Sequence, residues 1–131
     1  GSQAVTAITD FTFNDPNGGM HIPCLANDDR FIYVAGGASV ADLPNAAARG
    51  LFRYWDTVTD AWDIHGNAKP LIHARWRHSC RVYGGWLYAF SGQPFGGRLL
   101  LNMERVSISP ASTIPNNFWN KTGLPAMSTT D

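Results

Sequence analysis

Short apolar runs that end in glycine mark the first half of the chain as β structure. Phe31-Ile32-Tyr33-Val34-Ala35 is rich in β-branched and aromatic residues and stops at Gly36-Gly37. A second apolar run leads into Trp55 to Trp62, where two Trp residues frame a turn rich in Asp and Thr. Runs of this kind, bounded by Gly and Asp, are typical of strands joined by loops and turns. We therefore predict strand, loop, strand, turn and strand between Phe31 and Trp62.

The same pattern occurs again about 55 residues later, beginning with Trp86-Leu87-Tyr88-Ala89-Phe90-Ser91-Gly92. A unit of about 50 residues that holds four short strands is typical of a propeller blade. The landmarks that repeat are Tyr33 and Tyr88, Gly37 and Gly92, and Pro70 and Pro125, each 55 residues apart, Cys24 and Cys80, 56 apart, and Trp62 and Trp119, 57 apart.

These residues resemble the kelch repeat, in which an Arg and a His precede the first strand, the second strand ends in Tyr-x-x-Gly-Gly, and a Tyr-Asp-Pro-x-Thr-Asn-x-Trp-like turn follows. The first copy matches with Tyr33, Gly36, Gly37, Trp55, Asp56, Thr59, Asp60 and Trp62. The second copy matches with Arg75, His78, Tyr88, Gly92, Glu104 and Trp119, but it has Ser91 for the first Gly and Ile108-Ser109-Pro110 at the turn. The resemblance covers most of the chain.

The resemblance implies an all-β fold: two four-stranded antiparallel blades of a kelch β-propeller, plus an N-terminal strand from a preceding blade. Gly1-Ser2 reads as an expression scar, and residues 3–20 hold the N-terminal strand and its loop. Residues 21–76 form the first repeat and 77–131 the second. Closed propellers have about 4 to 8 blades. We therefore expect a homo-oligomer, formed by ring closure or by strand exchange through Ala4 to Phe13.

The innermost strands are expected at His21 to Ala26 and His78 to Tyr83, and Trp55, Trp62 and Trp119 are expected to be buried between neighbouring sheets. Cys24 and Cys80 hold equivalent places in the two repeats, so we expect two buried free thiols and a cytoplasmic protein. With His21 and His78 they include ligand types suited to zinc. A structural zinc site needs four converging ligands, however, so packed inner strands are favoured and no metal or other cofactor is expected.

Composition excludes some classes of partner. Ten basic residues balance ten acidic ones, which gives no electrostatic footprint for nucleic acid or for an anionic membrane. The sequence lacks an apolar run of about 18 residues, the minimum for a membrane span. It also lacks a recognisable nucleophile with a base and an orienting group, so we do not expect an enzyme.

The candidate binding face follows from strand direction. Strands alternate in a blade, so the loops after the second and the fourth strands emerge on one face. Arg75 is one candidate binding residue on this face, but it could instead cap backbone carbonyls or pair with acidic residues of the next blade. The kelch proteins that this chain resembles commonly hold a partner's peptide on this face, and guanidinium groups beside an aromatic ring favour an acidic segment. The candidate binding residues are His73, Arg75, Arg77, Gln93, Phe95 and Arg98.

Two alternatives stay open. Trp76, Trp86 and Asn67 are candidates for carbohydrate binding. The blades could also belong to a larger enzymatic propeller similar to galactose oxidase or to the sugar mutarotases, although the copper ligands of the former are not identifiable here. The favoured hypothesis is a protein-interaction module.

Overall fold

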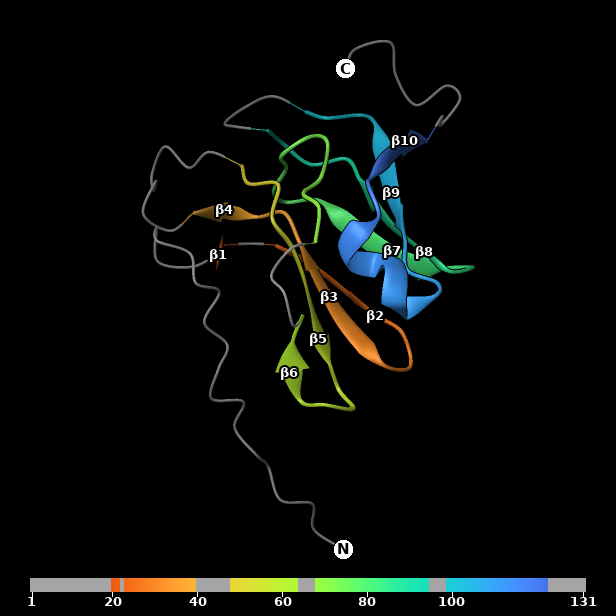
Figure 1. The fold of residues 1–131 in the computed structure, drawn as a ribbon. Helices are drawn as coiled ribbons and strands as arrows, with labels where there is room; N and C mark the ends of the chain where they lie inside the picture. Colours follow the sequence, from red (N-terminus) through yellow and green to blue (C-terminus); the bar gives the residue numbers. More distant parts are fainter. Residues whose placement is uncertain (1–19, 22, 40–47, 64–67, 95–98, 123–131) are drawn as a thin grey trace, which may run out of the picture.

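The structure is a computed structural model that describes residues 20–21, 23–39, 48–63, 68–94 and 99–122. Two four-stranded antiparallel sheets dominate this part of the chain (Figure 1). The first sheet has the order β2 (Cys24–Asn27), β3 (Phe31–Ala35), β5 (Phe52–Asp56) and β6 (Ala61–Trp62). The second has the order β7 (Ser79–Tyr83), β8 (Trp86–Phe90), β9 (Met103–Ser107) and β10 (Asn120–Thr122).

Each sheet is a meander in which strands that follow one another in the sequence are paired, so the predicted all-β class and strand order are confirmed. His21 differs from its prediction. It belongs to β1 (Met20–His21), which pairs with β4 (Ala38–Ser39) rather than extending β2. A 3-10 helix, η2 (Ala111–Asn116), is inserted between β9 and β10. The expected strand at Ala4 to Phe13 lies outside the described residues.

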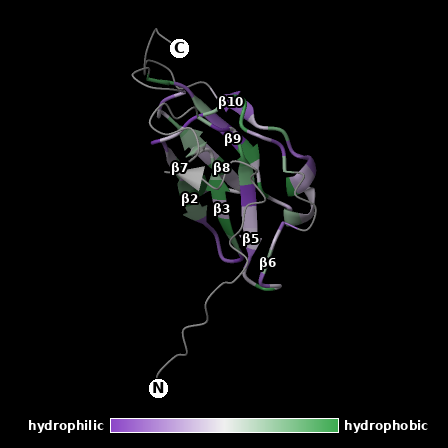
Figure 2. Ribbon diagram, turned by 90° about the vertical axis from the view of Figure 1, so that its left-hand side faces the viewer, coloured by the Kyte–Doolittle hydropathy of each residue, from purple (hydrophilic) through white to green (hydrophobic). Residues whose placement is uncertain are grey.

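The core lies between the two sheets, and hydrophobic colouring is concentrated in their strands (Figure 2). Because side chains alternate along a strand, β5 turns Phe52 and Tyr54 toward this core. Trp119 crosses between the sheets, with its ring edge-on to Phe52 at 5.3 Å between centroids. Its indole Nε1 donates a hydrogen bond of 3.1 Å to the Lys69 carbonyl.

Of the three tryptophans predicted to be buried between neighbouring sheets, only Trp119 belongs to the core between the two sheets, while Trp55 is buried outside it and Trp62 is not buried. Trp55 and Trp119 are 5% and 4% exposed. Trp62 is only half-buried, because it lies on the two-residue strand β6 and packs edge-on against Trp55. Trp62 therefore shields Trp55 instead of filling the space between the sheets.

Cys24 and Cys80 form a disulfide that joins β2 to β7, with their Cα atoms 5.7 Å apart. The prediction of two free thiols was wrong. β2 and β7 are the first strands of their sheets and lie side by side, so equivalent positions in the two repeats become neighbours in space. The expectation of a cytoplasmic location rested on free thiols and loses that basis, since disulfides persist in oxidising compartments. Across the described residues, no helix has the length and apolar character required to cross a bilayer.

Candidate functional site

Backbone hydrogen bonds tie three segments together at the end of the molecule where β3 and β8 finish. The segments come from both sheets and from the connection between them. We call this arrangement the platform. Its bonds run from Gly37 N to Arg75 O (2.8 Å), Arg75 N to Arg49 O (3.2 Å), Trp76 N to Gln93 O and Gln93 N to Trp76 O (3.0 Å each), and Ala48 N to Pro94 O (3.0 Å).

Glycine is required where the platform meets the connecting segment. Gly36 and Gly92 have positive φ, +69° and +88°, a region that other residues rarely adopt. A Cβ on Gly92 would lie 2.6 Å from His78 Cβ, and one on Gly36 would lie 2.5 Å from the Arg75 carbonyl oxygen. The glycines that end the second strands in the kelch-like pattern therefore let the segment 75–78 pass close to both sheets.

Arg75 lies inside the protein, which corrects its prediction as a surface binding residue. Its side chain is fully buried, as is that of Glu104 on β9, and the two form an ion pair of 2.7 Å. The alternative role, capping carbonyls and pairing with an acid of the second repeat, is the one observed. Further bonds from the Arg75 guanidinium reach Asn102 Oδ1 (2.7 Å) and the carbonyls of His73 (3.3 Å), Ser91 (3.1 Å) and Asn102 (3.3 Å).

The other predicted site residues have different places. Arg77 is exposed, and its guanidinium carbon lies 4.2 Å from the centroid of the Trp76 ring. Gln93 is half-buried and pairs with Trp76 through its backbone. His73 is half-buried, its amide donates to Glu104 Oε2 (3.0 Å), and its ring nitrogen Nε2 is buried without a hydrogen bond. Phe95 and Arg98 lie outside the described residues. The structure thus brings Arg77, Trp76 and Gln93 together and removes Arg75 from the surface.

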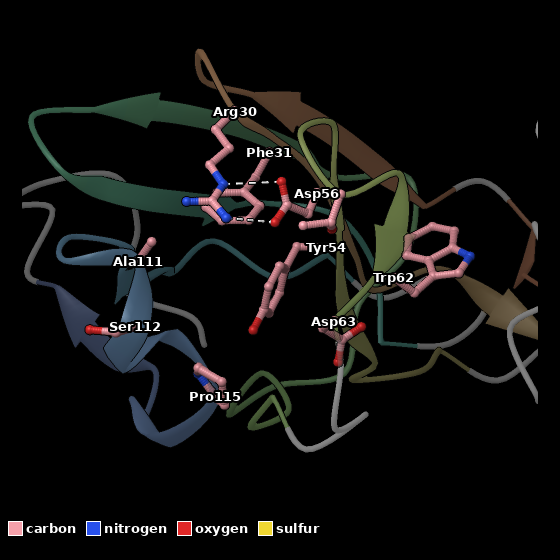
Figure 3. A pocket seen from close by; sticks show the side chains of 10 residues that line it. Arg30, Phe31, Tyr54, Asp56, Trp62, Asp63, Ala111, Ser112 and Pro115 are labelled. Atoms are coloured by element: carbon pink, nitrogen blue, oxygen red, sulfur yellow. Dashed lines mark hydrogen bonds and ion pairs between the residues drawn. The ribbon is translucent and has the colours of Figure 1, made fainter.

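A groove at the opposite end of the sheets was not predicted (Figure 3). It has a volume of about 330 Å³ and lies between the first sheet and η2. No pattern in the sequence indicated where the twelve residues between β9 and β10, which include η2, would pack. The groove is lined by Arg30, Phe31, Tyr54, Asp56, Thr59, Trp62, Asp63, Ala111, Ser112 and Pro115.

Charged groups in the groove are paired. Arg30 binds Asp56 through two hydrogen bonds of 3.0 and 2.8 Å, drawn as dashed lines in Figure 3. The Arg30 hydrogen bond holds the pKa of Asp56 well below its usual value. Asp63 accepts a 2.6 Å bond from Arg53 Nε. Burial raises the pKa of Tyr54, and the carboxylates of Asp63 and Asp56 raise it further, so its hydroxyl keeps its proton at neutral pH.

No protein-family model matches the chain, and a comparison with curated proteins finds no match either.

Proposed function

We propose that the chain is a protein-interaction module made of two kelch-like propeller blades, and that the platform holds a short segment of a partner protein. The observation that carries this proposal is the set of backbone hydrogen bonds that joins both sheets and their connection at one end. Rigidly placed loops lose little conformational entropy when a ligand binds, which favours recognition. The proposal includes no catalytic step and no cofactor.

The chemistry of the platform favours an acidic segment. Arg77 is exposed and stacks on Trp76. Stacking on the ring restrains the guanidinium, while its forked N–H groups suit a carboxylate. With Arg75 buried, we assign the recognition of a carboxylate to Arg77, together with the sequence-predicted Arg98.

The test is binding of acidic and neutral peptides from an array, followed by titration of the best acidic peptide in solution. Arg77→Ala is expected to weaken binding by about tenfold or more, because a hydrogen bond to a charged group contributes about 1.5 to 3 kcal/mol. Arg81→Ala is the matched control, since Arg81 is also exposed but lies on β7, away from the platform. Equal binding by the wild type and Arg77→Ala, or equal weakening by both variants, would contradict the proposal.

The groove supports a second candidate function, binding of a small polar ligand such as a sugar. Phe31, Tyr54 and Trp62 line it with rings, while Asp56 and Ser112 add polar groups, a combination typical of small-molecule sites. A glycan array tests this candidate. A glycan that binds the wild type and Arg77→Ala alike, but loses affinity for Tyr54→Phe, would assign the binding to the groove.

A further inference from the structure

Three side chains that can bind a metal converge where the first strands of the two sheets meet. They are Cys24 on β2, Cys80 on β7 and His78 just before β7. One ligand atom from each lies within 4.8 Å of the other two. In a tetrahedral zinc site, Zn–S bonds of about 2.3 Å and Zn–N bonds of about 2.0 Å place ligand atoms roughly 3.5 to 3.8 Å apart. The three ligand atoms are therefore close enough to share one zinc ion once the S–S bond between the two cysteines is broken.

His78 has properties that suit a metal ligand. Both of its ring nitrogens are buried and lack a hydrogen bond of standard geometry among the described residues, although the Ala35 backbone lies close enough to interact with the imidazole. A buried polar group without a partner costs about 1 to 3 kcal/mol, so such groups call for an explanation.

The backbone holds the imidazole in place. A Cβ on Gly36 would lie 2.5 Å from His78 Cε1 and 2.8 Å from Nε2, and one on Gly92 would lie 2.6 Å from His78 Cβ. The ring therefore packs directly on Gly36, while Cα and Cβ of His78 pack on Gly92, just before β7 and close to the two sulfurs. This placement leaves few other positions for the ring.

We propose that, when the disulfide is reduced, Cys24, Cys80 and His78 bind a Zn²⁺ ion. A dithiol reductant supplies two electrons and two protons: the S–S bond breaks, each cysteine sulfur takes a proton, and the reductant becomes a disulfide. Zn²⁺ then binds both sulfurs as thiolates and releases these two protons, while the neutral imidazole binds without releasing any. Three protein ligands leave the fourth position of zinc to water.

The two states exclude each other, because both use the same sulfurs. Each of them connects β2 to β7, so the sheets stay joined under oxidising conditions by a covalent bond and under reducing conditions by a metal. Half-buried Cys80 provides the route by which the ion and the reductant reach the buried Cys24. This inference does not depend on the platform or on the groove.

The test compares the oxidised and the reduced full chain. The reduced chain is prepared with a phosphine, which does not compete for metal as a thiol does, and is titrated with Co²⁺ as an absorbing substitute for Zn²⁺. We expect one ion per reduced chain, a thiolate-to-cobalt charge-transfer band, displacement by Zn²⁺, and a higher Tm with Zn²⁺. The oxidised chain should show none of these. Since this comparison uses only the wild type, it does not depend on how well a variant folds.

The imidazole is tested with His78→Gln, which keeps both cysteines. Loss of a ligand should weaken Zn²⁺ binding at least about a hundredfold, since even outer-shell changes cost about 10- to 100-fold. His73→Gln is the control, because His73 is outside the cluster, and its Zn²⁺ affinity should equal that of the wild type. Absence of a thiolate band in the reduced wild type would overturn the proposal. So would equal affinity of His78→Gln and the wild type, or binding by the oxidised chain.

Discussion

The Arg75 guanidinium is surrounded by acceptors from the second sheet, although the sequence places Arg75 in a loop before that sheet. Its backbone meanwhile bonds to Gly37 and Arg49 in the first repeat. Composition and spacing identified an Arg at this position but could not decide between a ligand-binding role and a structural role. The burial of Arg75 depends on how the connection between the two sheets packs against them, which the sequence pattern does not show. The sequence contained one signal for the ion-pair partner of Arg75, namely Glu104, which matches the kelch pattern.

Arg75→Ala is expected to destabilise the fold by about 3 to 5 kcal/mol, because it leaves the buried Glu104 carboxylate without its partner. Urea denaturation followed by tryptophan fluorescence measures the change. Arg81→Ala, an exposed arginine on β7, should alter stability by less than about 0.5 kcal/mol. A stable Arg75→Ala protein that fails to bind acidic peptides would contradict this structural role and indicate that Arg75 takes part in binding.

His78 should make the protein less stable in mild acid. Its pKa is about 4 in the folded protein and about 6.5 in the unfolded chain, so between these pH values the unfolded state binds more protons. Stability therefore falls as the pH drops from 6.5 to 4, by up to about 3 kcal/mol for this group. Asp28 also has a lowered pKa, but its contribution is lost only at lower pH. Urea midpoints of the oxidised protein at pH 7 and 5 should differ less for His78→Gln than for the wild type.

At the scale of elements, the period of the repeat was sufficient to predict the eight strands of the two sheets, because apolar runs and glycine ends are local features. The second of the three strands predicted between Phe31 and Trp62, for example, is observed as β5 at Phe52–Asp56. The sequence did not predict η2 or the pairing of β1 with β4, since neither has a repeat equivalent or a hydrophobic period. The groove was missed for the same reason, as η2 forms one of its walls.

The glycine that ends β8 provides a test of close packing between elements. Gly92→Ala should cost clearly more than Gly84→Ala, although both positions have positive φ. A Cβ at Gly92 would lie 2.7 Å from the Trp76 carbonyl oxygen, whereas a Cβ at Gly84 would have no atom within 4 Å. Gly84→Ala should therefore lose only about 1 to 2 kcal/mol, from backbone strain. Equal urea midpoints for the two variants would show that residues 75–78 do not pack closely against the end of β8.

At the scale of the whole molecule, the first sheet leaves an apolar patch on the side that faces away from the core. Leu25 is 63% and Ile32 38% exposed, while Phe31 and Tyr33, which point the other way, are buried. We propose that the two sheets act as propeller blades and that another copy of the chain covers this patch, since two blades cannot close a propeller. Zinc or a disulfide between β2 and β7 would not replace this contact, as both lie within one chain.

Light scattering should therefore give the mass of two or more chains, each of 14.3 kDa. The double variant Leu25→Lys and Ile32→Lys should shift the protein to the monomer, since two charges on the patch oppose its burial. Val58→Lys is the control, because Val58 is 73% exposed but lies in the turn between β5 and β6. A wild-type mass of 14.3 kDa with a single cooperative unfolding transition would contradict the proposal.

The side chain of Arg75 binds Glu104 and Asn102 of the second repeat, although Arg75 itself belongs to the first repeat. The repeating unit of the sequence therefore does not coincide with the unit that packs together in the fold. A repeat boundary after residue 76 would separate Arg75 from Glu104. A duplicated copy of residues 77–131 would then contain Glu104 but not Arg75. If the chain is lengthened by recombination, we expect the breakpoint between Asp63 and residue 68, so that it precedes the segment that contains Arg75. Growth of the protein by added copies of the repeat would then proceed in pieces that each carry an arginine for the sheet that follows.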